Sequence, residues 1–152
     1  MDSASASASA STSTFIACSE ASTSYTSDYD IFINHRGPDV KNTFASYLYR
    51  RLISTGLRVF LDKPELVEGQ PITHQIEAAI KSAAIQIAIF SPTYAQSKWC
   101  LDELILMILS RATILPVFYK VKPSELRWTG RDNKGAYAEA LRNHEEKQRY
   151  DS

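Results

Sequence analysis

The sequence has few cysteines, no long hydrophobic run and no excess of either charge. Its two cysteines, Cys18 and Cys100, lie in a polar tract and in a predicted helix, and such a pair builds neither a disulfide framework nor a zinc site. No apolar run reaches the roughly 20 residues of a membrane-spanning helix. The 17 basic and 17 acidic side chains cancel, which removes the global attraction to nucleic acid. We therefore expect a reducing, intracellular setting and no nucleic-acid or membrane partner.

The first 28 residues form a Ser/Ala/Thr-rich tract with few large apolar side chains. Such a segment cannot offset its own ordering entropy, so we expect residues 1–28 to be disordered. No lysine or arginine precedes Arg36, whereas organelle-import peptides are arginine-rich and amphipathic. We expect a cytoplasmic protein, with the nucleus as an alternative and no plastid import. The remaining residues, 29–150, are enough for one compact domain.

From Tyr29 onward, short apolar runs alternate with amphipathic segments of helical length. This alternation predicts an α/β fold with a central parallel sheet and helices on both faces. We expect strands at 29–34, 57–62, 83–91 and 113–119. Pro116 cannot donate a ladder hydrogen bond, so the last strand is expected at an edge or to contain a bulge. We expect helices from Asp39 to Gly56, after Pro71, from Lys98 to about Arg111, and over 135–150.

Helix ends and core faces follow from residue type and spacing. Asp39 and Ser97 are predicted N-caps, Pro71 a first helical residue, and Gly56 a helix stop. In the first helix, spacing of four predicts a buried face: Phe44, Leu48 and Leu52. In the helix predicted from Lys98 to about Arg111, the expected core stripe is Leu101, Leu104, Ile105 and Ile108. In the helix predicted after Pro71, we expect burial of Ile72, Ile76, Ala79 and Ile80.

Ligands of an open parallel sheet bind where loops follow the carboxyl ends of the strands. These loops are 34–39, 62–70, 91–98 and 119–133. None contains a glycine-rich phosphate cradle, which argues against a P-loop NTPase and a dinucleotide-binding dehydrogenase. The three histidines lack ligand spacing, so no metal site is expected: His35, His74 and His144.

Four segments together closely resemble plant TIR (Toll/interleukin receptor) domains in order and spacing. They are YDIFINHRGPDVKNTFASYLYRRL, FLDKPELVEGQPI, AIKSAAIQIAIFSPTYAQSKWCLDEL and ILPVFYKVKPSELR. The resemblance covers residues 29 to about 148. It implies a flavodoxin-like fold, self-association, association with other TIR proteins in plant immune signalling, and cleavage of NAD or NADP as substrate, with no cofactor.

The resemblance also assigns site residues. Glu103 matches the family's catalytic glutamate, and a substrate-binding role is implied for Arg36, Gly37, Pro38, Asp39, Gly69, Ser97 and Trp99. Arg36 is the expected phosphate partner. Helical spacing places Glu103 off the predicted core stripe, on a face with Trp99 and Leu106. Without the resemblance, Glu103 would be interpreted as a surface acid, and Cys100 as a packing residue.

One carboxylate can suffice for this chemistry. Nicotinamide leaves as a neutral base from a cationic pyridinium, so the protonating acid of ordinary glycosidases is dispensable. The carboxylate would bind ribose hydroxyls and stabilise an oxocarbenium-like transition state.

Several positions depart from the family pattern. His35 stands where phenylalanine is usual, and Pro38 where glutamate is usual. The first helix carries Ser46-Tyr47 where the family often has Ser-His. We also expect the family's fifth strand and last helix to be absent. These departures leave open a catalytically weak adaptor that binds other TIR-containing receptors. A receiver-like phosphorylation domain with Asp62 at a strand end is a third alternative.

Overall fold

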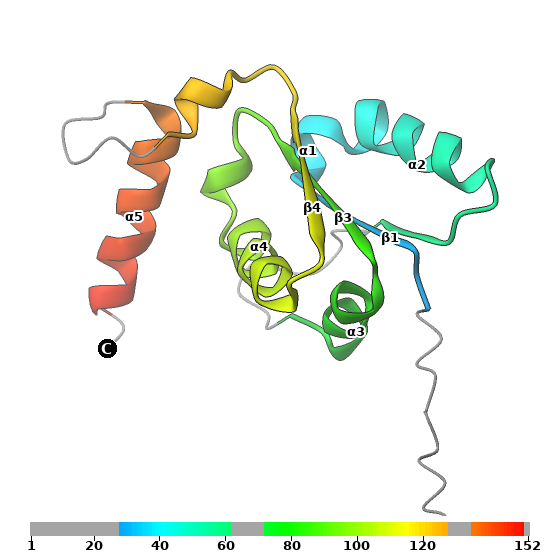
Figure 1. Cartoon of the computed structure of the whole chain (residues 1–152). Helices are drawn as coiled ribbons and strands as arrows, with labels where there is room; N and C mark the ends of the chain where they lie inside the picture. Colours follow the sequence, from blue (N-terminus) through cyan, green and yellow to red (C-terminus); the bar gives the residue numbers. More distant parts are fainter. Residues whose placement is uncertain (1–27, 62–71, 128–134, 151–152) are drawn as a thin grey trace, which may run out of the picture.

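The centre of the protein is a four-stranded parallel sheet. The computed structural model describes residues 28–61, 72–127 and 135–150. Its strands are β1 (Ile31–His35), β2 (Val59–Leu61), β3 (Ile85–Phe90) and β4 (Thr113–Phe118). They are ordered β2-β1-β3-β4, and every pair is parallel (Figure 1). This order starts as in flavodoxin-like folds, which confirms the predicted fold class.

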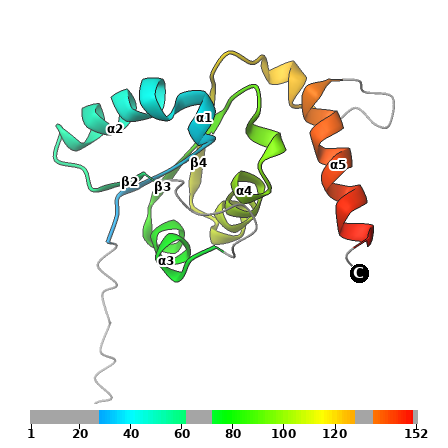
Figure 2. The same ribbon diagram turned by 180° about the vertical axis from the view of Figure 1, so that it is seen from behind.

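Helices cover both faces of the sheet, as predicted. The segment α1 (Gly37–Val40), η1 (Lys41–Ala45) and α2 (Ser46–Ile53) lies on one face, whereas α3 (His74–Ser82) and α4 (Lys98–Ser110) lie on the other (Figures 1 and 2). The chain continues through the short 3₁₀ turns η2 (Tyr94–Gln96) and η3 (Pro123–Glu125), and ends in α5 (Ala136–Tyr150). None of the helices in the described part of the chain is long and apolar enough to cross a bilayer.

The alternation of side chains along β1 and β3 divides the core into two layers, because successive strand residues point to opposite faces. Ile33 and Ile89 face the α2 side, where Phe44, Leu48 and Leu52 pack as predicted. Phe32 faces the α3/α4 side, with buried partners on both helices. These partners are Ile76, Ala79, Ile80 and Met107, with Ile72 partly buried against them.

One predicted helix start is wrong. The N-cap position of α1 is Arg36, not Asp39, and Asp39 lies in the first turn instead. Its carboxylate binds another loop, so it cannot cap this helix. The next helix, α3, begins at His74 after Thr73, and the predicted first helical residue, Pro71, lies outside the described residues. Gly56 does follow the end of α2, with a positive φ of 86° that glycine adopts without strain.

The predicted core stripe of α4 is also wrong in part. Ile105 and Ile108 are 55% and 60% exposed, whereas Met107 is fully buried. The buried residues of α4 are Cys100, Glu103 and Met107. Most positions of α4 between Trp99 and Leu109 are apolar, so helical periodicity fits more than one stripe. The packing against β1 and the neighbouring helices selects the observed one.

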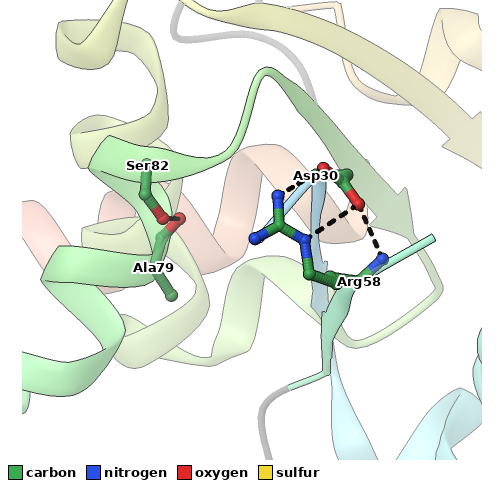
Figure 3. Close-up of polar contacts among 4 residues, drawn as sticks. All are labelled: Asp30, Arg58, Ala79 and Ser82. Atoms are coloured by element: carbon green, nitrogen blue, oxygen red, sulfur yellow. Dashed lines mark hydrogen bonds and ion pairs between the residues drawn. The ribbon is translucent and has the colours of Figure 1, made fainter. Parts of the chain in front are cut away.

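The amino ends of β1 and β2 are joined by an exposed ion pair. Asp30 accepts hydrogen bonds from the backbone N–H of Arg58 (2.8 Å) and from its guanidinium (2.8 Å to Oδ1), which holds the pKa of Asp30 below its usual value (Figure 3). At the end of α3, the Ser82 hydroxyl donates to the Ala79 carbonyl (Figure 3). Both contacts lie at the opposite end of the strands from His35, so neither shapes a carboxyl-end site.

Pro116 lies in β4, which pairs only with β3 among the described residues, and the edge-strand prediction is confirmed. Several predictions concern residues outside the described ranges. These are the disordered tail, Asp62, Gly69, Pro71 and the loop 62–70.

Candidate functional site

Glu103 lies at the carboxyl edge of the sheet, in a buried polar contact with the end of β1. Its side chain is 1% exposed. The side-chain amide of Asn34 donates from Nδ2 to Glu103 Oε2 over 2.6 Å. The interpretation of Glu103 as a surface acid, off the core stripe, is therefore wrong. The first turn of α4 packs against β1, which turns this face of the helix inward.

Tyr94 completes the contact around Asn34. Its hydroxyl donates to Asn34 Oδ1, and Asn34 Nδ2 also lies 3.4 Å from the Cys100 carbonyl oxygen. The pKa of Tyr94 is raised well above its usual value, mainly by burial and further by the neighbouring Cys100 and Glu103. The hydroxyl is therefore protonated at neutral pH and available as a donor. Asn34 and Tyr94 are 0% and 1% exposed, so the group is sealed within the protein.

The start of α4 is set by Ser97, as predicted. Its hydroxyl accepts a hydrogen bond from the Cys100 backbone N–H at 3.3 Å. An N-cap of this kind satisfies one of the free N–H groups of the first turn. Cys100 is buried and its thiol lies 3.5 Å from the His35 carbonyl oxygen, which confirms that it packs.

Asp39 joins the loop after β1 to the loop after β3. Its carboxylate accepts hydrogen bonds from the Ser91 hydroxyl (2.6 Å), the Thr93 N–H (2.9 Å) and the Thr93 hydroxyl (2.7 Å). Burial acts to raise the pKa of Asp39, but these donors and the charge of Arg36 outweigh it, and the pKa is lowered. The three donors fix the two loops relative to each other at the edge where Glu103 lies.

The other predicted binding residues occupy different environments. Arg36 is half-buried, Gly37 is buried and Pro38 is exposed, all in the turn after β1. Trp99 is half-buried and packs against the core layer between the sheet and α3/α4. The structure thus brings Arg36, Gly37, Pro38 and Asp39 together, while Gly69 lies outside the described residues.

A second buried aromatic side chain ties α5 to this edge. The Tyr137 hydroxyl donates to the Ser91 carbonyl, and His144 Nε2 lies 2.9 Å from the Ala95 carbonyl oxygen. Burial raises the pKa of Tyr137 above its usual value. Both contacts hold α5 against the segment that follows β3.

Sequence reasoning missed Asn34 and Tyr94 as parts of the site. The available signal was a polar residue at the end of an otherwise apolar strand, since IFI precedes Asn34. Such a residue needs a buried hydrogen-bond partner. The neighbouring sequence does not indicate which residue that partner is, because Glu103 is 69 residues away along the chain. In the ranges that the structure describes, no cluster of His, Cys, Asp or Glu could hold a metal ion.

Comparison with known proteins identifies the family. A family model described as the TIR domain matches residues 28–152. The chain belongs to the TIR domain family. Its match runs over most of the chain, in agreement with the sequence resemblance.

Plant proteins are among the relatives of this TIR chain. It is 45% identical over 108 residues to a Brachypodium distachyon protein named probable 2′ cyclic ADP-D-ribose synthase BdTIR, which covers 71% of this chain and 48% of that protein. It is 35% identical over 137 residues to TMV resistance protein N of Nicotiana glutinosa, covering 88% of this chain and 12% of that protein. The chain thus spans about half or less of the length of these relatives.

Solved structures agree with the fold. The TIR domains of the activated Roq1 resistosome, described as directly recognizing the pathogen effector XopQ, share 34% identity and a TM-score of 0.65, covering 78% of this chain and 71% of that one. The TIR domain of the Toll-related receptor TRR-2 from Hydra magnipapillata has 21% identity and a TM-score of 0.52, covering 80% of this chain and 98% of that one. The second match supports the fold alone.

Proposed function

We propose that this TIR chain self-associates and cleaves NAD or NADP at the bond between nicotinamide and ribose, with Glu103 as the catalytic carboxylate. The observation that carries the proposal is the placement of Glu103, which Asn34 holds at the carboxyl edge of the parallel sheet. Ligands of open α/β sheets bind at this edge. The name of the Brachypodium relative, a probable cyclic ADP-ribose synthase, supports the same substrate class.

The proposed chemistry needs one carboxylate. The bond between ribose and nicotinamide breaks with its electron pair going to the pyridinium nitrogen, which leaves nicotinamide neutral. Glu103 stabilises the positive charge that develops on the ribose and accepts a hydrogen bond from a ribose hydroxyl. Water then attacks the anomeric carbon and loses a proton, giving ADP-ribose, or an adenine nitrogen attacks and gives a cyclic product.

Substrate binding is proposed for the residues around this carboxylate. Arg36 offers a positive charge to the phosphates from the turn after β1, and Asp39 keeps that turn in place through Ser91 and Thr93. Roles in binding are also proposed for Gly37, Pro38, Gly69, Ser97 and Trp99. No resident cofactor takes part in this proposal.

The burial of Glu103 sets a condition on activity. A side chain that is 1% exposed contacts a dinucleotide only after neighbouring groups move. Self-association is the event that we propose to cause this movement, so activity depends on local protein concentration.

Release of nicotinamide by the purified full chain, free and concentrated on a bead surface, tests this proposal. We expect turnover on the beads and a loss of about 100-fold or more in Glu103→Gln, as for other groups that stabilise transition-state charge. The matched control is Asp102→Asn, because the neighbouring Asp102 carboxylate binds only the exposed Lys98 ammonium in the contacts described, at 2.7 Å. Full activity of Glu103→Gln would rule out the mechanism.

The second candidate is a catalytically silent adaptor that docks onto other TIR proteins. The same burial of Glu103 favours it, together with apolar side chains of α4 that face solvent: Ile105, Ile108 and Leu109. Co-assembly with a TIR-containing receptor that persists in Glu103→Gln, without NAD turnover by the wild-type chain, would establish this role.

A cytoplasmic location, with the nucleus as the alternative, is part of the proposal. Imaging a carboxyl-terminal fluorescent fusion in plant cells checks it, and plastid fluorescence would contradict it.

A further inference from the structure

We infer that Asn34 is the positioning residue of Glu103, and that it fixes one carboxylate oxygen while the carboxylate acts on the ribose. This inference rests on the proposed NAD cleavage. The Asn34 side chain contacts Glu103, the Tyr94 hydroxyl and the Cys100 carbonyl in the contacts described, and its proposed action is through Glu103. Its Nδ2 lies 2.6 Å from Glu103 Oε2, within hydrogen-bonding distance of that oxygen.

The amide of Asn34 has one favourable orientation. Tyr94 donates its hydroxyl to Oδ1, and the Cys100 carbonyl oxygen lies on the side of Nδ2. Turning the amide over would set Oδ1 against the carboxylate oxygen of Glu103 and would leave two acceptors facing each other. The donor therefore points at Glu103, because the reverse orientation would oppose two acceptors.

The backbone that carries Asn34 is held on the sheet. Asn34 lies in β1, a central strand, and pairs in register with Ala88 of β3. Ala88 is fully buried, and so is the Phe32 side chain on the same face of β1. A donor held there can fix a carboxylate on α4 even when nearby loops move. The orientation of Glu103 is thus set by the core of the domain and survives the opening that substrate binding requires.

The experiment compares two buried amides on adjacent strands. Asn34→Leu removes the donor with little change in volume. Gln86→Leu is the matched control, because Gln86 is also 0% exposed but donates to the Ile80 carbonyl (2.7 Å) and the Ser110 hydroxyl (2.9 Å), away from Glu103. Tyr94→Phe is the second variant, since it keeps the amide but removes the hydroxyl that orients it.

We expect Asn34→Leu to lower kcat for nicotinamide release by about 10- to 100-fold with KM nearly unchanged, because misplacing a catalytic group costs rate rather than binding. Tyr94→Phe should show a smaller loss of kcat, and Gln86→Leu should retain wild-type kcat once folded. Isotope-edited infrared spectra with labelled glutamate should show a carboxylate band that shifts in Asn34→Leu but not in Gln86→Leu. In the Glu103→Gln background that shift should be absent.

The outcomes separate this inference from the function on which it rests. Wild-type kcat in Asn34→Leu, or an equal loss in Gln86→Leu, would overturn the positioning role while NAD cleavage stands. If Asn34→Leu does not fold, wild-type kcat in Tyr94→Phe overturns it. An inactive wild-type chain on beads would overturn both the proposed function and this role.

Discussion

Removing the charge of Asp39 should destabilise the domain without changing its shape. The Asp39 carboxylate accepts three hydrogen bonds from Ser91 and Thr93. Hydrogen bonds to a charged group contribute about 1.5–3 kcal/mol each and neutral ones about 0.5–1.5 kcal/mol. In Asp39→Asn an amide can keep neutral versions of these bonds, because both hydroxyls can turn to donate or accept. Since Asp39 is half-buried and partly screened by water, we expect a loss of about 1–2 kcal/mol in unfolding free energy.

The pH dependence of that loss is the sharper part of the test. The folded-state pKa of Asp39 lies below its usual value, so its charge stabilises the fold above the unfolded-state pKa, about 3.9. That contribution is lost as pH falls through the folded-state pKa. The free-energy gap between wild type and Asp39→Asn should therefore be constant at neutral pH and close in acid.

Urea unfolding followed by circular dichroism measures the gap at each pH. At neutral pH the midpoint of Asp39→Asn should fall by about 1 M, given an m-value of about 1–3 kcal/mol per M. Asp39→Ala should lose more, about 2–4 kcal/mol, because the Thr93 N–H is left without its acceptor. Equal midpoints for wild type and Asp39→Asn at neutral pH would refute the assignment of Asp39 as the link between the two loops. A gap that stays constant into acid would refute the lowered pKa.

Two further predictions test the buried side chains. Met107→Ala should lower the unfolding free energy by about 2–5 kcal/mol because it leaves a cavity. Ile108→Ala, at the adjacent and 60% exposed position, should change the unfolding free energy by less than about 0.5 kcal/mol. Equal effects of the two variants in urea unfolding would mean that the buried stripe of α4 is misplaced. The raised pKa of Tyr94 stabilises the fold fully below the unfolded tyrosine value of about 10, and this contribution is lost as pH rises above it. Tyr94→Phe should thus show a shallower fall of stability between about pH 9 and 11, and an unchanged slope in that range would contradict the burial of this hydroxyl.

The fold was largely predictable because its signals are local. Short apolar runs separated by amphipathic segments predict a parallel sheet, and Pro116 predicts the edge strand. The Ser97 cap was predictable because a cap acts over three residues. The predicted Asp39 cap was wrong because the carboxylate accepts three hydrogen bonds from a distant loop instead of capping its own helix.

The sequence by itself determined the sheet and its alternating helices, and its four matching segments pointed to the TIR family. Only the tertiary structure decided which face of α4 is buried, because nearly every position there is apolar and periodicity fits several stripes. It also decided that Glu103 is enclosed. The Asn34 amide on β1 donates to this carboxylate, and the Tyr94 hydroxyl in the turn after β3 donates to Asn34. Contacts between residues so far apart in the chain give no periodic pattern in the sequence.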